Sequence, residues 1–133
     1  MRPFFIYLVT LATFAVTDAL WLAVMGPTFY TTEIGPLMRP SPNLPVAALF
    51  YLVYPIGLVA LATLPALAEG ALAGALWRAA VFGLCAYATY DLTNLATLKG
   101  WSPLLSVVDL AWGVVASMLA ATSGYFFGRW LQS

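Results

Sequence analysis

The sequence has no histidine, one cysteine and only ten charged residues, five acidic and five basic, among its 133 residues. Without histidine, a metal ion held by imidazole and a histidine general base are both excluded. The single cysteine, Cys85, excludes a disulfide framework and a CxxC redox motif. A net charge of zero and no basic cluster indicate that nucleic acid is not a partner.

The scarcity of charge also excludes a soluble monomer. Soluble domains carry about 25% charged residues, whereas this chain has 8% charged and 63% hydrophobic residues. A short chain buries a smaller fraction of its surface than a large one does, and ten charges cannot cover the surface that remains. The composition therefore indicates an integral membrane protein.

Four apolar stretches are long enough to cross the hydrocarbon core of a bilayer, which takes about 20 helical residues. They cover residues 3–25, 44–68, 73–98 and 103–127. Apolar residues occur in blocks and do not alternate with polar ones, which is typical of helices and not of a β-barrel. Because short connections join the last three stretches, neighbouring helices are antiparallel. The sequence predicts an all-α fold, a single four-helix transmembrane bundle over residues 1–133.

The connection over residues 26–43 is the one long loop, and it contains four prolines. We expect Gly26 and Pro27 to end the first helix, because proline disrupts helical hydrogen bonding. The apolar residues of the loop leave two alternatives open. The loop either folds back over the end of the bundle as a lid or lies at the membrane surface as a plain connector.

Three of the five acidic residues, Asp18, Asp91 and Asp109, lie inside the predicted spans, where a charge costs at least about 2.5–3.5 kcal/mol. Asp18 and Asp91 each precede the end of their span by seven residues, and Asp109 follows the start of its span by six. Those three span ends face the same side of the membrane. At 1.5 Å per residue, all three aspartates lie about 9–11 Å below one surface. They therefore share one layer of one leaflet.

Other polar and aromatic residues fall in the same layer. Trp21 and Trp112 each follow an aspartate by three residues, which places an indole one helical turn from a carboxylate. We predict a binding layer with two cations at its rim. Its members are Asp18, Trp21, Tyr90, Asp91, Thr93, Asn94, Asp109 and Trp112, and the rim residues are Arg39 and Lys99.

Three carboxylates in one layer cannot all remain ionised without compensation. Protonation, ion pairing with Arg39 or Lys99, and a divalent cation with oxygen ligands are the three alternatives. We expect protonation together with the rim cations, and neither a bound metal nor a cofactor. In a purely structural role, the aspartates would instead stabilise the bundle through hydrogen bonds between helices.

These features support three functions. The first is binding of a small polar group, a lipid headgroup or a proton in the polar layer, with membrane lipid as the partner. The alternative is an accessory subunit that packs into a homo-oligomer or a larger membrane complex through Gly124 and Gly128. The third is a lipid-modifying enzyme with an aspartate as general acid or base. The chain has no nucleophile–base pair, so catalysis is the least favoured function.

Four segments resemble a family of small bacterial predicted membrane proteins that is described only as a domain of unknown function. The segments are TDALWL (Thr17–Leu22), IGPL (Ile34–Leu37), YDLTNLATLKGW (Tyr90–Trp101) and VDLAWG (Val108–Gly113). The resemblance covers nearly the whole chain and implies a multi-pass protein of the bacterial inner membrane with no established activity. The positive-inside rule favours cytoplasmic termini, because Arg2, Arg78 and Arg129 then lie inside.

Overall fold

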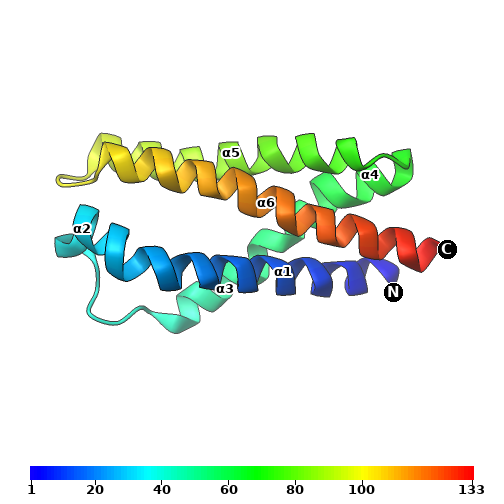
Figure 1. The fold of residues 1–133 in the computed structure, drawn as a ribbon, viewed down its shortest axis with the longest axis horizontal. Coiled ribbons are helices and arrows are strands. Elements are labelled where there is room, and N and C mark those ends of the chain that lie inside the picture. The colour runs from blue at the N-terminus through cyan, green and yellow to red at the C-terminus, as the bar shows by residue number, and fades with distance from the viewer.

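The computed structural model describes residues 1–133 and contains only helices and their connections (Figure 1). The helices are α1 (Arg2–Met25), η1 (Gly26–Tyr30), α2 (Thr31–Ile34), η2 (Gly35–Leu37), α3 (Leu44–Leu58), η3 (Val59–Thr63), α4 (Leu64–Glu69), α5 (Leu72–Thr97) and α6 (Pro103–Gln132). Here η1 and η3 are π-helical and η2 is a 3₁₀ turn. They form four continuous apolar helical segments, each long enough to cross a membrane. The predicted all-α four-helix fold is confirmed.

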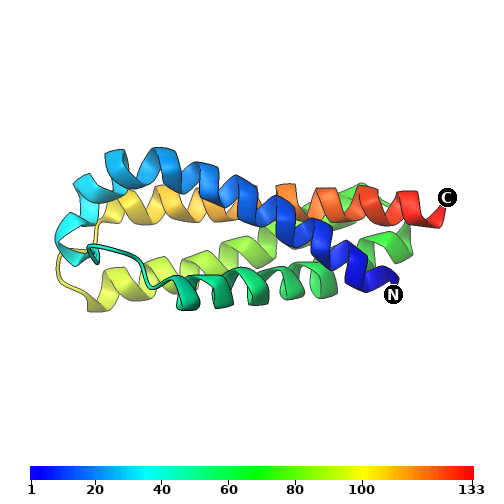
Figure 2. The same cartoon turned by 90° about the horizontal axis from the view of Figure 1, so that it is seen from below.

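The two ends of the bundle differ. Both termini and the turn after Glu69 lie at one end, which we call the terminal end, whereas α2 and the α5–α6 turn lie at the other, the site end (Figures 1 and 2). Helix α6 packs along both α1 and α5, and α3 packs on α1. The contacts of α5 with the second span come mainly from η3 and α4. Figure 1 accordingly shows α3 diverging from α5 towards the site end.

Local sequence signals set the ends of these helices. The Ser102 hydroxyl accepts a hydrogen bond from the Leu105 N–H (3.0 Å) and caps α6, and the Asn43 side chain caps α3 in the same way. Helix α4 ends at Gly70, whose φ of 73° lies in the left-handed region that glycine tolerates. Each cap satisfies backbone groups that would otherwise be unpaired at a helix end.

The α-helix α1 ends at Met25, as the Gly26–Pro27 pair predicts, but the expectation that the helical path stops there is wrong. The helical path continues to Leu37, because a π-helical turn absorbs the proline. The Thr31 N–H bonds to the Gly26 carbonyl five residues back, so the missing N–H of Pro27 interrupts the bonding only locally. The continued segment turns Tyr30 into the bundle, where it is buried. The segment as far as α2 folds back onto the bundle through Tyr30 and Glu33, whereas Leu37 and Met38 beyond it are exposed.

Small residues let α5 and α6 approach closely. A Cβ atom on Gly83 would lie 2.6 Å from the Ser117 hydroxyl oxygen and 2.7 Å from the Gly113 carbonyl oxygen. A Cβ atom on Gly113 would lie 2.2 Å from the ring of Tyr87. Backbone contact between these helices thus fixes where the Tyr87 ring lies.

Gly124 and Gly128 perform the same role between α6 and the first two spans. A Cβ atom on Gly124 would lie 2.5 Å from the Thr10 hydroxyl oxygen, and one on Gly128 would lie 2.5 Å from Leu67. Both glycines are buried within the chain. This face is therefore occupied by α1 and α4 and is not exposed for docking.

We expect Gly83→Ala to lower the free energy of unfolding by about 1–3 kcal/mol, because a new methyl group cannot fit against backbone without moving α6. Gly26→Ala is the matched control, since a Cβ atom there meets nothing within 4 Å and the backbone is helical. Thermal unfolding of the purified protein in a mild detergent measures both. Equal melting temperatures would contradict the close approach of α5 and α6.

Candidate functional site

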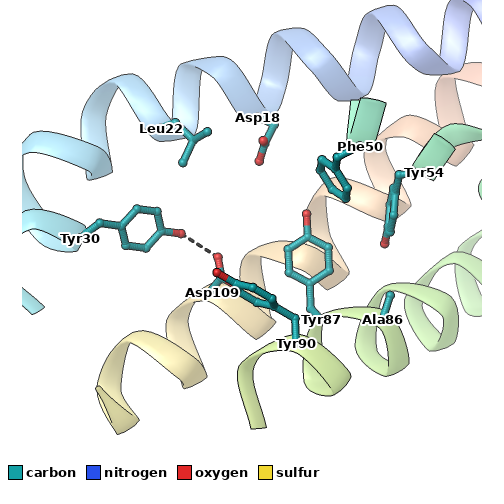
Figure 3. A pocket seen from close by; sticks show the side chains of 9 residues that line it. All are labelled: Asp18, Leu22, Tyr30, Phe50, Tyr54, Ala86, Tyr87, Tyr90 and Asp109. Atoms are coloured by element: carbon teal, nitrogen blue, oxygen red, sulfur yellow. Dashed lines mark hydrogen bonds between the residues drawn. The ribbon is translucent and has the colours of Figure 1, made fainter. Parts of the chain in front are cut away.

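The three intramembrane aspartates lie in the half of the bundle nearer the site end. Asp18 on α1 and Asp109 on α6 project towards each other across the interior (Figure 3). Asp91 on α5 lies next to Asp109 and is fully buried. The structure thus brings the three residues into one region, from three different helices.

Asp18 receives two hydrogen bonds from neighbouring helices. The Trp112 indole N–H donates to Oδ1 (2.8 Å), and the Tyr51 hydroxyl donates to Oδ2 (2.5 Å). The side chain is only 7% exposed. Because the donors come from α6 and α3, this one carboxylate ties three spans together.

Asp109 is held from the other direction. The Tyr30 hydroxyl donates to its Oδ1 (2.8 Å), and the Trp21 indole N–H donates to that hydroxyl (2.8 Å). The indoles of Trp21 and Trp112 stack in parallel with their centroids 4.5 Å apart. The segment after the first span is therefore fastened to the start of the fourth.

In consequence, the tryptophan of each Asp-x-x-Trp unit contributes to binding the aspartate of the other unit, an arrangement that we call the exchange of indoles. Trp112 binds the aspartate of α1, and Trp21 reaches the aspartate of α6 through Tyr30. Antiparallel packing explains the exchange. Three residues further along α1 lie nearer the site end, whereas three residues further along α6 lie nearer the terminal end. Each tryptophan therefore lies level with the aspartate of the facing helix.

A cavity of about 350 Å³ lies between these helices. It is lined by Asp18, Leu22, Tyr30, Phe50, Tyr54, Ala86, Tyr87, Tyr90 and Asp109, as Figure 3 shows. Its polar groups are two carboxylates and four tyrosine hydroxyls, and its remaining wall is apolar. A volume of this size is typical of sites for small molecules.

The cavity reaches the side of the bundle. Leu22 of α1, Phe50 of α3 and Tyr90 of α5 line it and are also 41%, 42% and 55% exposed. These three residues belong to membrane-length apolar helices. The mouth of the cavity is therefore bordered by exposed side chains on the side of the bundle.

Three of the eight predicted members of the layer line the cavity: Asp18, Tyr90 and Asp109. The other five do not: Trp21, Asp91, Thr93, Asn94 and Trp112. Thr93 is exposed, and its hydroxyl donates to backbone carbonyls of its own helix, including that of Tyr90 (3.1 Å). Asn94 is half-buried. The spacing that places Tyr90, Thr93 and Asn94 near one another on α5 does not show which of them faces inwards.

The predicted ion pairing with Arg39 or Lys99 is wrong, because both side chains are exposed and neither pairs with a carboxylate. The structure contains one ion pair, between Glu69 and Arg78 at the terminal end. Nor are three or more acidic or cysteine side chains grouped so that they could hold a metal ion. Asp18 and Asp109 accept hydrogen bonds from neutral side chains, and none of the three aspartates pairs with a cation.

Some residues of the site are not part of the predicted layer. The second span begins on the same side as the aspartates, and Tyr51 and Tyr54 lie 7 and 10 residues after its first residue, Leu44, so their depth is a usable signal. Tyr87 precedes Tyr90 by three residues and shares its face. Tyr30 carries no such signal, because it follows the glycine–proline pair that predicts the end of a helix.

The family described as "Predicted membrane protein (DUF2177)" matches residues 4–126. The chain belongs to this family. The matched residues of this DUF2177 protein include all three intramembrane aspartates and both stacked tryptophans. The predicted resemblance to an uncharacterised membrane family is thereby confirmed. Neither curated proteins nor solved structures include a match to the chain.

We expect Trp112→Phe to destabilise the protein by about 1–3 kcal/mol, because buried Asp18 loses a hydrogen-bond donor. Phenylalanine keeps an aromatic ring against Trp21. The control is Trp130→Phe, at a tryptophan that is 66% exposed near the C-terminus. If thermal unfolding in detergent shows no difference between the two variants, the bond between Trp112 and Asp18 does not hold α6 to α1.

Proposed function

We propose that this DUF2177 protein binds the polar headgroup of a lipid-like molecule inside the membrane. The supporting observation is the cavity that combines the carboxylates of Asp18 and Asp109 with a mouth among exposed apolar side chains. A headgroup would lie at the carboxylates while the acyl chain passes out between α1, α3 and α5. Binding of a small polar molecule or of a proton at the same carboxylates is a narrower form of this hypothesis.

The shape of the bundle supports entry from the bilayer. Because α3 packs on α1 and diverges from α5 towards the site end, the mouth lies on the side of the bundle. Tyr30 covers the end of the cavity near α2, and its bond to Asp109 holds it there. A further bond from Ser102 to Glu33 (2.5 Å) ties α2 to the start of α6. A ligand that enters laterally avoids these closed contacts.

Two other functions have less support. Docking of an accessory subunit through Gly124 and Gly128 has less support, because these glycines already pack against Thr10 and Leu67 of the same chain. A lipid-modifying enzyme has less support, because the polar side chains of the cavity lining are aspartates and tyrosines alone, without the serine, cysteine or lysine that covalent catalysis commonly uses. Assembly into a homo-oligomer or a larger membrane complex would have to use another surface.

The photoreactive-lipid test uses vesicles that contain a phospholipid with a diazirine close to its glycerol. We expect ultraviolet light to label cavity residues such as Phe50 and Tyr90, as mapped by mass spectrometry. Ala86→Trp should reduce this labelling about tenfold, because the indole fills the cavity. Ala60→Trp adds the same side chain at an exposed position outside the cavity and should leave labelling unchanged. Equal labelling of the two variants would refute the proposed function.

We also propose that the protein lies in the bacterial inner membrane with both termini in the cytoplasm. Three arginines, Arg2, Arg78 and Arg129, lie towards the terminal end, and Arg39 and Lys99 belong to the site end. By the positive-inside rule the terminal end is cytoplasmic. The cavity then lies nearer the outer surface of the membrane.

Fusions to the C-terminus test this orientation. A green fluorescent protein placed after Ser133 should fluoresce, because it folds in the cytoplasm, and an alkaline phosphatase at the same position should be inactive. Active phosphatase with a dark fluorescent fusion would reverse the orientation.

A further inference from the structure

The carboxylate oxygens around the cavity outnumber the hydrogen-bond donors that reach them. Asp18 accepts one bond at each oxygen, but Asp109 accepts only the bond from Tyr30, at Oδ1. Neither oxygen of Asp91 has any partner, although the residue is fully buried. Three carboxylate oxygens therefore lack a donor from any residue other than an aspartate, and the Asp91 and Asp109 carboxyl groups lie within hydrogen-bonding distance of each other.

No side chain of this protein supplies the missing positive charge. Arg39 and Lys99 are exposed, and Arg78 pairs with Glu69 at the terminal end. Arg129 bonds to the Tyr125 hydroxyl at that same end (3.1 Å). Asp91 and Asp109 can share one proton, because their carboxyl groups lie within hydrogen-bonding distance of each other. The negative charge that the pair retains has no counter-charge within the chain.

We infer that the headgroup taken by this cavity carries an ammonium group, an inference that rests on the proposed function. A primary ammonium presents three N–H donors and one positive charge, which suits the free oxygen of Asp109 in the cavity lining and the negative charge that Asp109 shares with Asp91. A hydroxyl headgroup offers one donor and no charge. An anionic headgroup would be repelled by the same carboxylates.

Aromatic rings add to this preference. Tyr87 and Tyr90 of α5 and Phe50 of α3 line the cavity together with the carboxylates. The face of an aromatic ring attracts a cation, most strongly where water is excluded. Carboxylates and ring faces in one cavity together favour a cationic headgroup over neutral and anionic ones.

Three single-chain amphiphiles of equal length test the inference: dodecylamine, dodecanol and dodecanoate. Each is added at pH 7 to the protein in a neutral maltoside detergent, and two quantities are recorded. These are the shift in melting temperature and the loss of labelling by the photoreactive lipid. We expect dodecylamine to act at a concentration about tenfold lower than dodecanol, a difference of about 1.4 kcal/mol, and dodecanoate to be weakest.

Two substitutions locate the effect. Asp109→Asn should reduce the advantage of dodecylamine over dodecanol, because it removes a carboxylate that lines the cavity. Asp91→Asn should reduce it less, because Asp91 adjoins Asp109 but is not part of the cavity lining. Glu69→Gln makes the same chemical change at the terminal end and should leave the advantage intact. The comparison of the three amphiphiles on the wild-type protein stands even if one variant fails to fold.

The outcomes separate this inference from the proposed function. If dodecylamine and dodecanol act at equal concentrations, or if dodecanoate acts best, the ammonium preference is overturned while lipid binding stands. If none of the three displaces the photoreactive lipid and Ala86→Trp leaves its labelling unchanged, the proposed function fails as well. An advantage of dodecylamine that survives both aspartate substitutions would also overturn the inference, because binding would then occur elsewhere.

Discussion

The exchange of indoles between α1 and α6 is the interaction on which the site depends. Trp112 donates to Asp18, while Trp21 donates to the hydroxyl of Tyr30, which in turn donates to Asp109. In the hydrocarbon core no water competes for these bonds, and a carboxylate without a donor would be costly there. The antiparallel helices are thus held in one register, with two carboxylates facing each other across the interior.

Once this register is set, the other two spans determine the shape of the cavity. Gly113 allows the Tyr87 ring to lie against α6, and the Tyr51 hydroxyl fastens α3 to Asp18. Because α3 follows α1 and leaves α5 uncovered near the site end, these contacts leave an open side. The same arrangement explains why polar groups lie deep inside while the mouth is bordered by apolar side chains.

Much of this arrangement could be predicted from the sequence. Span length and composition predict the four helices, and the depth of each aspartate below one surface predicts the shared layer. The direction in which each side chain points around its helix is harder to predict, because α5 is apolar on most sides and has no strong polar face. Thr93 therefore belongs to the predicted layer, although the structure places it at the exposed surface of the bundle.

Tyr30 shows a second limit of sequence reasoning. Proline normally ends a helix in water, but in a membrane the chain cannot leave its backbone unpaired. A π-helical turn lets the helix continue past Pro27 and returns Tyr30 to the bundle. The partner of Asp109 is consequently a residue that local sequence signals assign to a loop.

An experimental density map of the protein in a lipid nanodisc tests the central claim most directly. The account predicts a lipid between α1, α3 and α5, with its headgroup within hydrogen-bonding distance of Asp109 and its chain passing between Leu22, Phe50 and Tyr90. A map in which these side chains close the mouth, and in which only protein lies beside Asp18 and Asp109, would contradict it.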